Sequence, residues 1–363
     1  MAYTTIDDPS AHFHTQLYTG DGSANHAITN DGNSDLQPDL VWIKNRDATD
    51  SHCLFDSTRG ATEVLHCDAG DDTETTDADT LDSFASDGFQ VDADDKVNTD
   101  TEKYVAWQWK ANGGSTTNVD GTGTAADTTK AGTYQANTTA GFSIITFSTG
   151  VDDFGDHRIQ HGLGAAPHFI ITKERDGTYA WYTYHHKGTD DNDYIMLNNT
   201  DPTSDAGARN VFDGSDFTSI YFEMDNNNIV NDSKTYVAYC WTSIQGYSKF
   251  GSYTGNGSAD GPFVYLGFKP AFVIIKSSTK ASQPWIMLTG KIATGTNSNP
   301  LIVALDADDT KAERGTFTSD FLSNGFKIRQ VSGSTTTSGE TYTYMAFAEQ
   351  PFVTSGGVPC TAR

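Results

Sequence analysis

The chain has few cysteines, few basic residues and no long apolar stretch, and each shortage excludes a class of protein. Its four cysteines in 363 residues include no Cys-x-x-Cys pair and have no histidines at zinc-site spacings, so neither a zinc module nor a redox motif is expected. No run of eighteen apolar residues occurs, which argues against insertion into a membrane. The opening residues lack a basic region followed by an apolar core, so we expect no secretory signal and folding in the cytoplasm. That compartment is reducing, and we expect no disulfides, with Cys53 and Cys240 buried in apolar strands.

Basic residues are scarce relative to acidic ones. Lys and Arg number 23 against 48 Asp and Glu, which gives a formal net charge of −25. Such a surface repels phosphate backbones, and no stripe of Lys and Arg interrupts it, so nucleic acid is not an expected partner. The simplest interpretation is solubility through charge repulsion. Two alternatives stay open: adaptation to salty water, where screening shortens the repulsion, and divalent cations that bridge acidic surfaces.

Long amphipathic helical patterns are also missing. Short runs rich in Val, Ile, Phe, Tyr, Trp and Thr alternate with clusters of Gly, Asn, Asp and Ser, as at residues 142–147 and 263–266. Asp-Gly and Asn-Gly pairs, typical of hairpin turns, recur along the chain. This pattern predicts an all-β fold of the sandwich or barrel type.

One pattern occurs three times in the same order. Pro-x-[Leu/Phe]-[Val/Ile]-x-x-Lys stands at residues 38–44, 167–173 and 270–276. Each copy is followed by Phe-x-x-x-[Gly/Tyr]-Phe-x-apolar, beginning at Phe84, Phe217 and Phe321, and then by an aromatic strand at 104–107, 236–239 and 344–347. Units of about 100 residues are too long for solenoid repeats and have the size of a free-standing domain. We therefore predict three tandem β-sandwich domains, of jelly-roll or lectin-like type, related by internal repeat.

The repeat sets the expected boundaries. The predicted parts are an N-terminal arm (1–12), repeat 1 (13–110), a Gly/Thr/Ser-rich linker (111–141), repeat 2 (142–245), repeat 3 (252–350) and a C-terminal arm (351–363). A brief joint at residues 246–251 separates the last two repeats. We expect each repeat to enclose its own apolar interior.

The Pro-to-Lys strand of each unit is almost wholly apolar, so both of its faces should be buried. Trp42, Ile171 and Ile274 hold the same position in the three copies and are expected to fill the centre of each sandwich. The closing lysines, Lys44, Lys173 and Lys276, are expected to be solvated or salt-bridged, with a recurrent interface contact as the alternative.

A search for catalytic motifs finds no His-Glu-x-x-His, no Gly-x-Ser-x-Gly and no phosphate loop, so we expect no enzymatic activity. Histidines at 12 and 14, at 157 and 161, and at 185 and 186 are expected to be solvated rather than bound to metal. Residues 92–100 are dense in carboxylates but lack the Gly and Glu of a helix-loop-helix calcium loop. No cofactor is expected, and loosely bound calcium between acidic loops stays an alternative.

A cluster of aromatic residues in the second unit is the main candidate for recognition. The predicted binding residues are Tyr179, Tyr182, Tyr184, His185 and His186. Because side chains alternate along a strand, Trp181 is expected in the core while Tyr182 and Tyr184 lean outward. Core packing, a protein interface and a stacked glycan are the three roles open to these rings.

Several motifs together resemble an uncharacterised virion-protein family of tailed bacteriophages. They are Tyr-Thr-Gly-x-Gly-Ser at 18–23 and 253–258, Gly-Phe-Lys-Pro-Ala-Phe-Val-Ile-Ile-Lys at 267–276, Asn-Gly-Phe-Lys-Ile at 324–328 and Tyr-x-Tyr-Met-Ala-Phe-Ala-Glu at 342–349. The resemblance covers the whole chain and implies a structural or tail-fibre-like protein without catalytic residues. One departure is the second unit, which has Ser-Thr-Gly-Val-Asp-Asp at 148–153 in place of the shared opening.

The resulting functional hypothesis is a non-enzymatic structural protein on the virion surface, assembled in the host cytoplasm. The first version is a tail-associated fibre or adhesin that contacts a host surface glycan or protein. The alternative is a capsid decoration protein bound to the head lattice. Expected partners are other tail or capsid proteins, and further copies of the chain are compatible with either version.

Overall fold

The computed structural model describes residues 2–68, 72–122, 128–150, 156–190, 193–205, 211–225, 230–292 and 301–360. Over these residues the regular secondary structure is almost wholly β-strand, so the all-β prediction is confirmed. The helical elements in the described ranges are α1 (Asp95–Asn98) and the 3₁₀ turns η1 (Pro9–Ala11), η2 (Gly214–Asp216) and η3 (Gly290–Ile292). None of the helices described here has the length and apolar character needed to cross a membrane.

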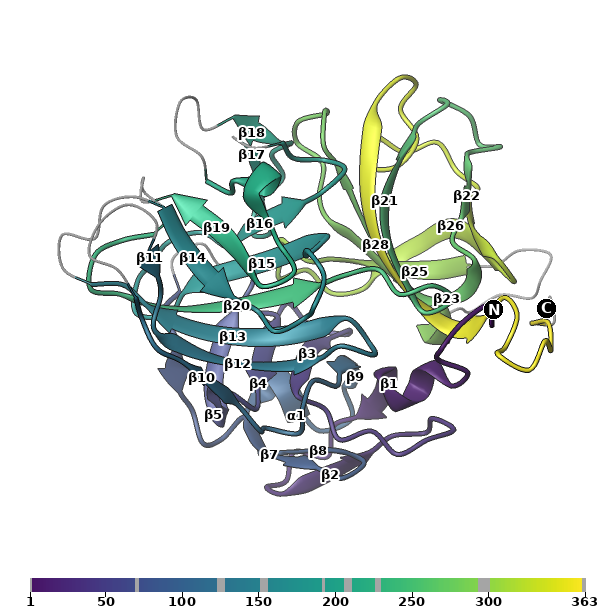
Figure 1. Ribbon diagram of the computed structural model, residues 1–363. Coiled ribbons are helices and arrows are strands. Elements are labelled where there is room, and N and C mark those ends of the chain that lie inside the picture. The colour runs from purple at the N-terminus through teal and green to yellow at the C-terminus, as the bar shows by residue number, and fades with distance from the viewer. Residues whose placement is uncertain are drawn as a thin grey trace.

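The first segment lies at the bottom of Figure 1. Its strands are β1 (Phe13–Thr19), β2 (His26–Thr29), β3 (Leu40–Asn45), β4 (Cys53–Asp56), β5 (Gly60–His66), β6 (Thr75–Thr76), β7 (Leu81–Ala85), β8 (Gly88–Val91) and β9 (Lys103–Trp109). They form a large sheet in the order β1-β9-β3-β4-β5-β6 and a small sheet in the order β2-β8-β7.

The second segment lies at the upper left of Figure 1. Its strands are β10 (Thr117–Val119), β11 (Thr128–Thr129), β12 (Gly132–Asn137), β13 (Phe142–Ser148), β14 (Asp156–Gln160), β15 (Phe169–Glu174), β16 (Tyr182–His185), β17 (Asp193–Met196), β18 (Ser204–Asp205), β19 (Tyr221–Asp225) and β20 (Thr235–Trp241). The large sheet runs β10-β12-β13-β20-β15-β16-β17-β18 and the small one β11-β14-β19, in which β11 and β14 are parallel.

The third segment lies at the upper right of Figure 1. Its strands are β21 (Ser248–Thr254), β22 (Phe263–Tyr265), β23 (Phe268–Ser277), β24 (Ile286–Thr289), β25 (Leu301–Asp306), β26 (Arg314–Leu322), β27 (Gly325–Ile328) and β28 (Thr341–Pro351). They make one sheet in the order β21-β28-β23-β24-β25-β26-β27-β22.

The pairing order is the same in the three large sheets. The first strand pairs with the last, the last pairs with the Pro-to-Lys strand, and two further strands follow: β1-β9-β3-β4-β5, β13-β20-β15-β16-β17 and β21-β28-β23-β24-β25. A tyrosine near the start of each last strand accepts a hydrogen bond from the backbone N–H five residues earlier. The pairs are Thr99 to Tyr104 (2.8 Å), Asn231 to Tyr236 (2.5 Å) and Thr337 to Tyr342 (3.0 Å). This corner fixes the turn that leads into the strand in the same way each time.

Both faces of each Pro-to-Lys strand are buried, as the sequence predicts. Because side chains alternate along a strand, the two faces enter two different cores. In β3, Val41 and Ile43 lie in an apolar interior confined to the first segment, while Leu40 and Trp42 lie in a core shared by all three segments. The other two segments have interiors of their own as well, and both contribute to the shared core.

The expectation that Trp42, Ile171 and Ile274 fill the centre of each sandwich is wrong. All three side chains belong to the shared core. Likewise, the expected three separate interiors are joined by this fourth one. When a strand is apolar on both faces, its sequence does not reveal which face enters the segment's own interior and which enters the shared core.

A closed ring of hydrogen bonds surrounds the shared core. The donor of each bond is a ring nitrogen of the residue just before β4, β16 or β24. The acceptor is the carbonyl of the last residue of β5, β17 or β25 in a neighbouring segment. The bonds run from His52 Nε2 to Asp306 O (3.0 Å), from Trp181 Nε1 to His66 O (2.9 Å) and from Trp285 Nε1 to Met196 O (2.8 Å). The first segment thus donates to the third, the third to the second and the second to the first. Head-to-tail contacts of this kind close into a ring when the rotation is right.

The three lysines that end the Pro-to-Lys strands are fully buried, so the expectation that they are solvated or salt-bridged is wrong. Lys44 Nζ donates to the carbonyls of Asn45 and Ala48, and Lys173 Nζ to those of Glu174 and Gly177. In both cases the ammonium is surrounded by backbone carbonyls of the turn that follows the strand, and these supply its hydrogen-bond partners. The local sequence pattern does not show that these carbonyls surround the lysine.

Lys276 also bonds a neighbouring segment, whereas the bonds of Lys44 and Lys173 stay within their own segments, so the alternative of a contact that recurs in all three copies is not met either. Lys276 Nζ donates to Gln283 O (2.7 Å) within the third segment and to Asn199 O (3.0 Å) in the second. Burial lowers the pKa of Lys173 and of Lys276 to about 8.

The stretch 111–141, expected to be a linker, contributes β10 and β12 to the second large sheet and β11 to the small one. Its sequence has few apolar residues, but an edge strand can be held mainly by backbone pairing. The third segment begins at β21 rather than at residue 252, so the expected joint is shorter than predicted. Residues 123–127, 151–153 and 361–363, which fall in the expected linker, the departing opening and the C-terminal arm, lie outside the described residues.

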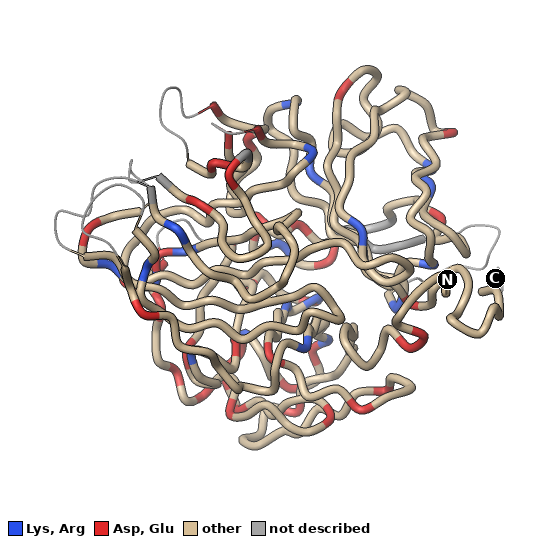
Figure 2. Tube along the Cα trace, in the orientation of Figure 1, with Lys and Arg blue, Asp and Glu red and all other residues tan. Residues whose placement is uncertain are grey.

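The terminal arms pack on the body of the protein and on each other. Thr4 Oγ1 donates to Gln245 O (2.8 Å), and the Phe352 N–H donates to Gly267 O (3.2 Å). The Ser355 N–H of one arm donates to Asp7 Oδ1 of the other (2.6 Å). The four cysteines are free, as expected. Figure 2 shows Asp and Glu spread over all three segments rather than gathered on one of them.

Candidate functional site

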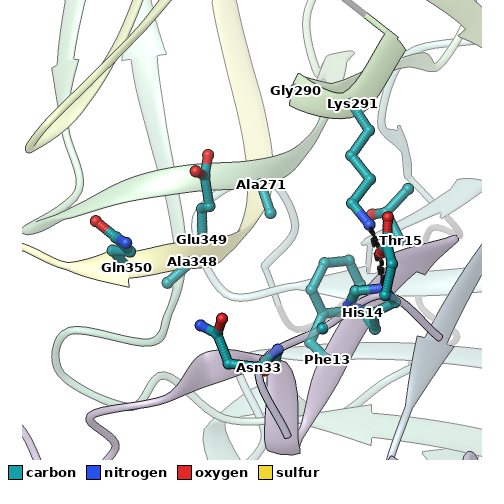
Figure 3. A pocket seen from close by; sticks show the side chains of 13 residues that line it. Phe13, His14, Thr15, Asn33, Ala271, Gly290, Lys291, Ala348, Glu349 and Gln350 are labelled. Atoms are coloured by element: carbon teal, nitrogen blue, oxygen red, sulfur yellow. Dashed lines mark hydrogen bonds and ion pairs between the residues drawn. The ribbon is translucent and has the colours of Figure 1, made fainter. Parts of the chain in front are cut away.

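A pocket of about 490 Å³ lies between the edge strand β1 of the first segment and the third segment (Figure 3). The lining residues come from η1, β1 and the loop after β2 on one side, and from β23, η3 and β28 on the other. They are Ser10, Phe13, His14, Thr15, Asp31, Gly32, Asn33, Ala271, Gly290, Lys291, Ala348, Glu349 and Gln350. The volume is in the range of small-molecule and peptide sites.

The loop at residues 31–34 is held in place by η1. Asp8 caps η1, and the Ser10 hydroxyl donates to Asp8 Oδ1 (2.6 Å). The same hydroxyl oxygen accepts the N–H groups of Asn33 (3.1 Å) and Ser34 (3.2 Å). This wall of the pocket is therefore fixed by a network of short-range polar contacts.

One end of the pocket carries a group of three charged or titratable side chains. His14 Nε2 lies 2.8 Å from Asp31 Oδ1 and 3.1 Å from Lys291 Nζ, and Lys291 also forms an ion pair with Asp31 (Figure 3). Burial and the nearby Lys291 charge lower the pKa of His14, so the ring is neutral near pH 7. The bonds from Lys291 and His14 lower the pKa of Asp31 despite its partial burial. Asp31 is thus the carboxylate and Lys291 the cation of this group.

The edge of β1 borders the pocket with backbone groups that β9 does not use. The Lys110 N–H donates to His12 O, and the Gly20 N–H donates to Glu102 O, so even-numbered residues of β1 make the ladder bonds. The N–H and C=O groups of Phe13 and Thr15 therefore point away from β9. Thr15 is 3 % exposed, and its hydroxyl has no hydrogen-bond partner among the described residues.

The opposite wall is formed mainly by small residues. Ala271, Gly290 and Ala348 leave room in front of the β1 edge. Glu349, at the rim, is paired with Lys269 (2.6 Å). The pocket therefore combines a backbone edge, the Lys291 ammonium and two carboxylates, which suits the binding of an extended polar ligand.

The five predicted binding residues do not form one site. Tyr179 is 41 % exposed, whereas Tyr182 packs edge-on against Tyr194 with ring centroids 5.4 Å apart. Tyr184 is 7 % exposed and packs on Phe217, so the prediction that it leans outward is wrong. Tyr184 lies in the second segment's own interior, since its face of β16 is the inner one. Trp181 is buried, as predicted.

The last two of the five, His185 and His186, contact the third segment. His185 Nε2 donates to Tyr344 O (3.0 Å), and His186 Nε2 donates to Phe250 O (3.0 Å). Burial lowers the pKa of His185 to about 3. A binding role for these five residues stays a prediction.

Other histidines expected in solvent are also buried. His14, His157 and His161 are each at most 6 % exposed. Burial lowers the pKa of His161 to about 4. Isolated histidines in a polar sequence give no signal of such burial, because the covering residues come from distant strands.

The acidic stretch 92–100 folds into the short helix α1 and its flanks. Asp94 Oδ1 accepts the Lys96 N–H (2.8 Å) and caps the helix. Elsewhere, oxygens of Asp213, Asp216 and Glu223 lie within 4.8 Å of one another, but Glu223 is already paired with Arg158 (2.5 Å). Calcium binding stays an alternative.

Sequence reasoning did not identify the pocket. Its residues are drawn from positions near 14, 32, 271, 290 and 349, which no local spacing connects. The pair His12 and His14 was noted as a motif but was assigned to solvent. The repeat itself carried the usable signal, which is a difference between the three units at one position. Directly after β4, β16 and β24 the units have Ser57, His186 and Gly290, so only the third unit lacks a side chain there.

Comparison with known proteins identifies a family but no function. A family model described as "Domain of unknown function (DUF7483)" matches residues 8–351, so the chain belongs to this family. No curated protein and no solved structure matches the chain significantly.

Proposed function

We propose that this protein is a non-enzymatic structural and binding component of the surface of a tailed phage, built from three tandem copies of one β-sandwich module. The first version of the function is a tail-associated adhesin that contacts the host surface. The proposal of a phage particle rests on the motif resemblance, and the proposal of a rigid binding body rests on the architecture.

The closed ring around the shared core is the observation that carries the proposal of a rigid body. Three segments with the same pairing order are locked head to tail by His52, Trp181 and Trp285. One chain thereby presents three related surfaces around one centre, as a trimer of smaller chains would. Such a body suits display and attachment, since the ring and core hold its loops in fixed relative positions.

The chemistry of the pocket supports binding over catalysis. Asp31 is engaged by Lys291, and the Ser10 hydroxyl is engaged by Asp8. The His14 ring is directed at Asp31 rather than at a hydroxyl nucleophile. General acid-base or nucleophilic catalysis requires such groups to be directed at a substrate.

The architecture also bears on the choice between adhesin and decoration protein. The boundaries between segments differ: Gly290 lies at the boundary between the first and third segments, where the other boundaries have Ser57 and His186 at the corresponding position. A pocket at one boundary that the corresponding side chains occupy at the others favours a specific contact, and hence the adhesin. A capsid decoration protein is the second candidate, because a compact body with three related faces also suits a lattice.

Labelling of intact particles tests the proposal. Gold-conjugated antibody fragments against the purified chain are expected to label tails in electron micrographs, and labelling of heads alone would replace the adhesin with the decoration protein. Absence of the chain from purified particles by mass spectrometry would overturn both versions. Incubation with host envelope polysaccharide is expected to produce no new reducing ends, with and without added calcium, and their appearance would overturn the non-enzymatic assignment.

A further inference from the structure

The strands β1, β13 and β21, which hold the first place in the shared pairing order, offer the same backbone groups at corresponding positions. The chain covers these groups differently in the three segments. Each of these strands has an aromatic residue whose ring stacks on the tyrosine near the start of the segment's last strand. The corresponding residue stands three positions before that aromatic residue. These residues are Thr15 before Tyr18, Ile144 before Phe147 and Phe250 before Tyr253. At each position the N–H and C=O groups point away from the last strand of the segment, which is β9, β20 or β28.

At the β13 edge, a strand covers these groups. β12 pairs antiparallel with β13, with Gln135 opposite Ile144. Gln135 is 1 % exposed, and its Nε2 donates to Ser57 Oγ (2.8 Å) and Thr58 Oγ1 (2.6 Å) of the first segment. A strand at this edge is thus held by both its backbone and one buried polar side chain that reaches the neighbouring segment.

At the β21 edge, side chains take the place of the strand. His186 Nε2 donates to the carbonyl of Phe250 (3.0 Å), and the Phe250 N–H donates to Ser243 Oγ (3.4 Å). His186 directly follows β16, as Ser57 directly follows β4. His186 and Ser243 together therefore satisfy the C=O and N–H groups that a strand would otherwise bond.

At the β1 edge, the corresponding space is the pocket. Gly290 directly follows β24 and so stands where Ser57 and His186 stand at the other boundaries. Having no side chain, Gly290 cannot cover Thr15 as His186 covers Phe250. Lys291 and Ala348 also line the pocket, and they correspond to Thr58 and Lys110 of the first segment. Thr58 and Lys110 are residues that β12 contacts, through Gln135 and Asn137 respectively.

We propose that this pocket binds an extended polypeptide segment of a partner protein, which adds to β1 as β12 adds to β13. Backbone pairing to the N–H and C=O groups of Phe13 and Thr15 supplies affinity, as in other cases of strand addition. The partner residue opposite Thr15 takes the position that Gln135 holds in β12, and its side chain is polar and amide-like. It meets the Thr15 hydroxyl and Lys291, whereas Gln135 meets Ser57 and Thr58. The proposal holds whether or not the protein belongs to a phage particle.

The chain itself supplies a suitable probe. A fluorescein-labelled peptide with the sequence of residues 131–138, Ala-Gly-Thr-Tyr-Gln-Ala-Asn-Thr, reproduces β12. Fluorescence polarisation measures its binding to the full-length chain. We expect the wild type to bind it with a dissociation constant in the micromolar range, and absence of binding at roughly 1 mM peptide would overturn the proposal.

Two substitutions at one position make a matched pair. A Cβ added at Gly290 would lie 3.5 Å from Phe321 and 3.8 Å from Ala271 O, which is ordinary contact, and so both variants should fold. Gly290→His places an imidazole where His186 stands at the β21 edge and is expected to weaken peptide binding at least about tenfold, whereas Gly290→Ala stays within about threefold of the wild type. Equal binding by Gly290→His would refute the assignment.

Hydrogen exchange on the unmodified chain tests the same contact without a substitution. Bound peptide is expected to slow exchange of the Phe13 and Thr15 amides, while amides of the β1–β9 ladder stay unchanged. Binding that protects neither amide would overturn the proposed site. If instead the chain dimerises on its own and Gly290→His abolishes the dimer in sedimentation experiments, the occupant is a second copy and the proposed partner is wrong.

Discussion

Trp109 is the residue whose removal tests the shared core most severely. Its side chain is fully buried, and its ring contacts aromatic residues of all three segments. The ring centroids are 5.1 Å from Phe13 of the first segment, 6.0 Å from Trp241 of the second and 5.6 Å from Phe347 of the third. Trp109→Ala therefore leaves a cavity at the junction of the segments rather than inside one of them.

The expected loss of unfolding free energy is about 3–5 kcal/mol, the usual range for a buried Trp or Phe replaced by Ala. Urea titration followed by far-ultraviolet circular dichroism and by intrinsic fluorescence gives the free energy by linear extrapolation. Both signals should shift together, since every segment loses contacts with the same ring. Tyr179→Ala, at a 41 % exposed position, is the control and should change stability by less than about 0.5 kcal/mol.

A loss below about 1 kcal/mol for Trp109→Ala would refute a tightly packed junction. So would a titration in which only part of the signal moves, because that result means that one segment unfolds apart from the others.

Three further predictions concern polar groups. Trp285→Phe removes the donor to Met196 O and is expected to cost about 1–3 kcal/mol in urea titrations, as a buried carbonyl loses its partner. Tyr342→Phe removes the acceptor of the Thr337 N–H and is expected to cost about 1–2 kcal/mol by the same assay. Because burial lowers the pKa of His161 from 6.5 to about 4, the unfolded chain takes up this proton first as the pH falls. The stability that the neutral ring contributes is present above pH 6.5 and is lost toward pH 4, by about 3 kcal/mol, which urea titrations at several pH values should record.

Each of these has a distinct contrary outcome. An unchanged midpoint for Trp285→Phe would mean that the ring bond adds nothing to stability. Full stability of Tyr342→Phe would mean that the hydrogen bond of the corner adds nothing to stability. A pH dependence that persists unaltered in His161→Gln would assign the acid loss to other groups.

The sequence predicted the strands well because strand propensity and turn residues are local. The Pro-to-Lys strands and the burial of both faces of β3, β15 and β23 follow from residues near each other in the chain. The Asp-Gly and Asn-Gly pairs at 87–88 and 324–325 form hairpin turns, whereas those at 31–32, 213–214 and 256–257 lie in other connections. The segment order in space did not follow. Trp42 and Val41 are neighbours of similar apolar character, and only the finished assembly shows that one faces the shared core and the other the interior of the first segment.

Polar groups were the least predictable part. Lys44 and Lys173 look like ordinary strand-end cations, yet turn carbonyls enclose them. Gln135 looks like a linker residue, but it is buried against Ser57. In each case the partner is set by how the chain packs around the polar atom, which composition and periodicity do not encode. The pocket belongs to the same class, since it arises from the absence of a side chain at Gly290.

Differential scanning calorimetry of the intact chain measures most directly whether the three segments form one body. The shared core and the closed ring predict a single transition in which the calorimetric and van't Hoff enthalpies agree. Two or three separable transitions, or a calorimetric enthalpy several times the van't Hoff value, would show that the segments unfold independently and would contradict the account.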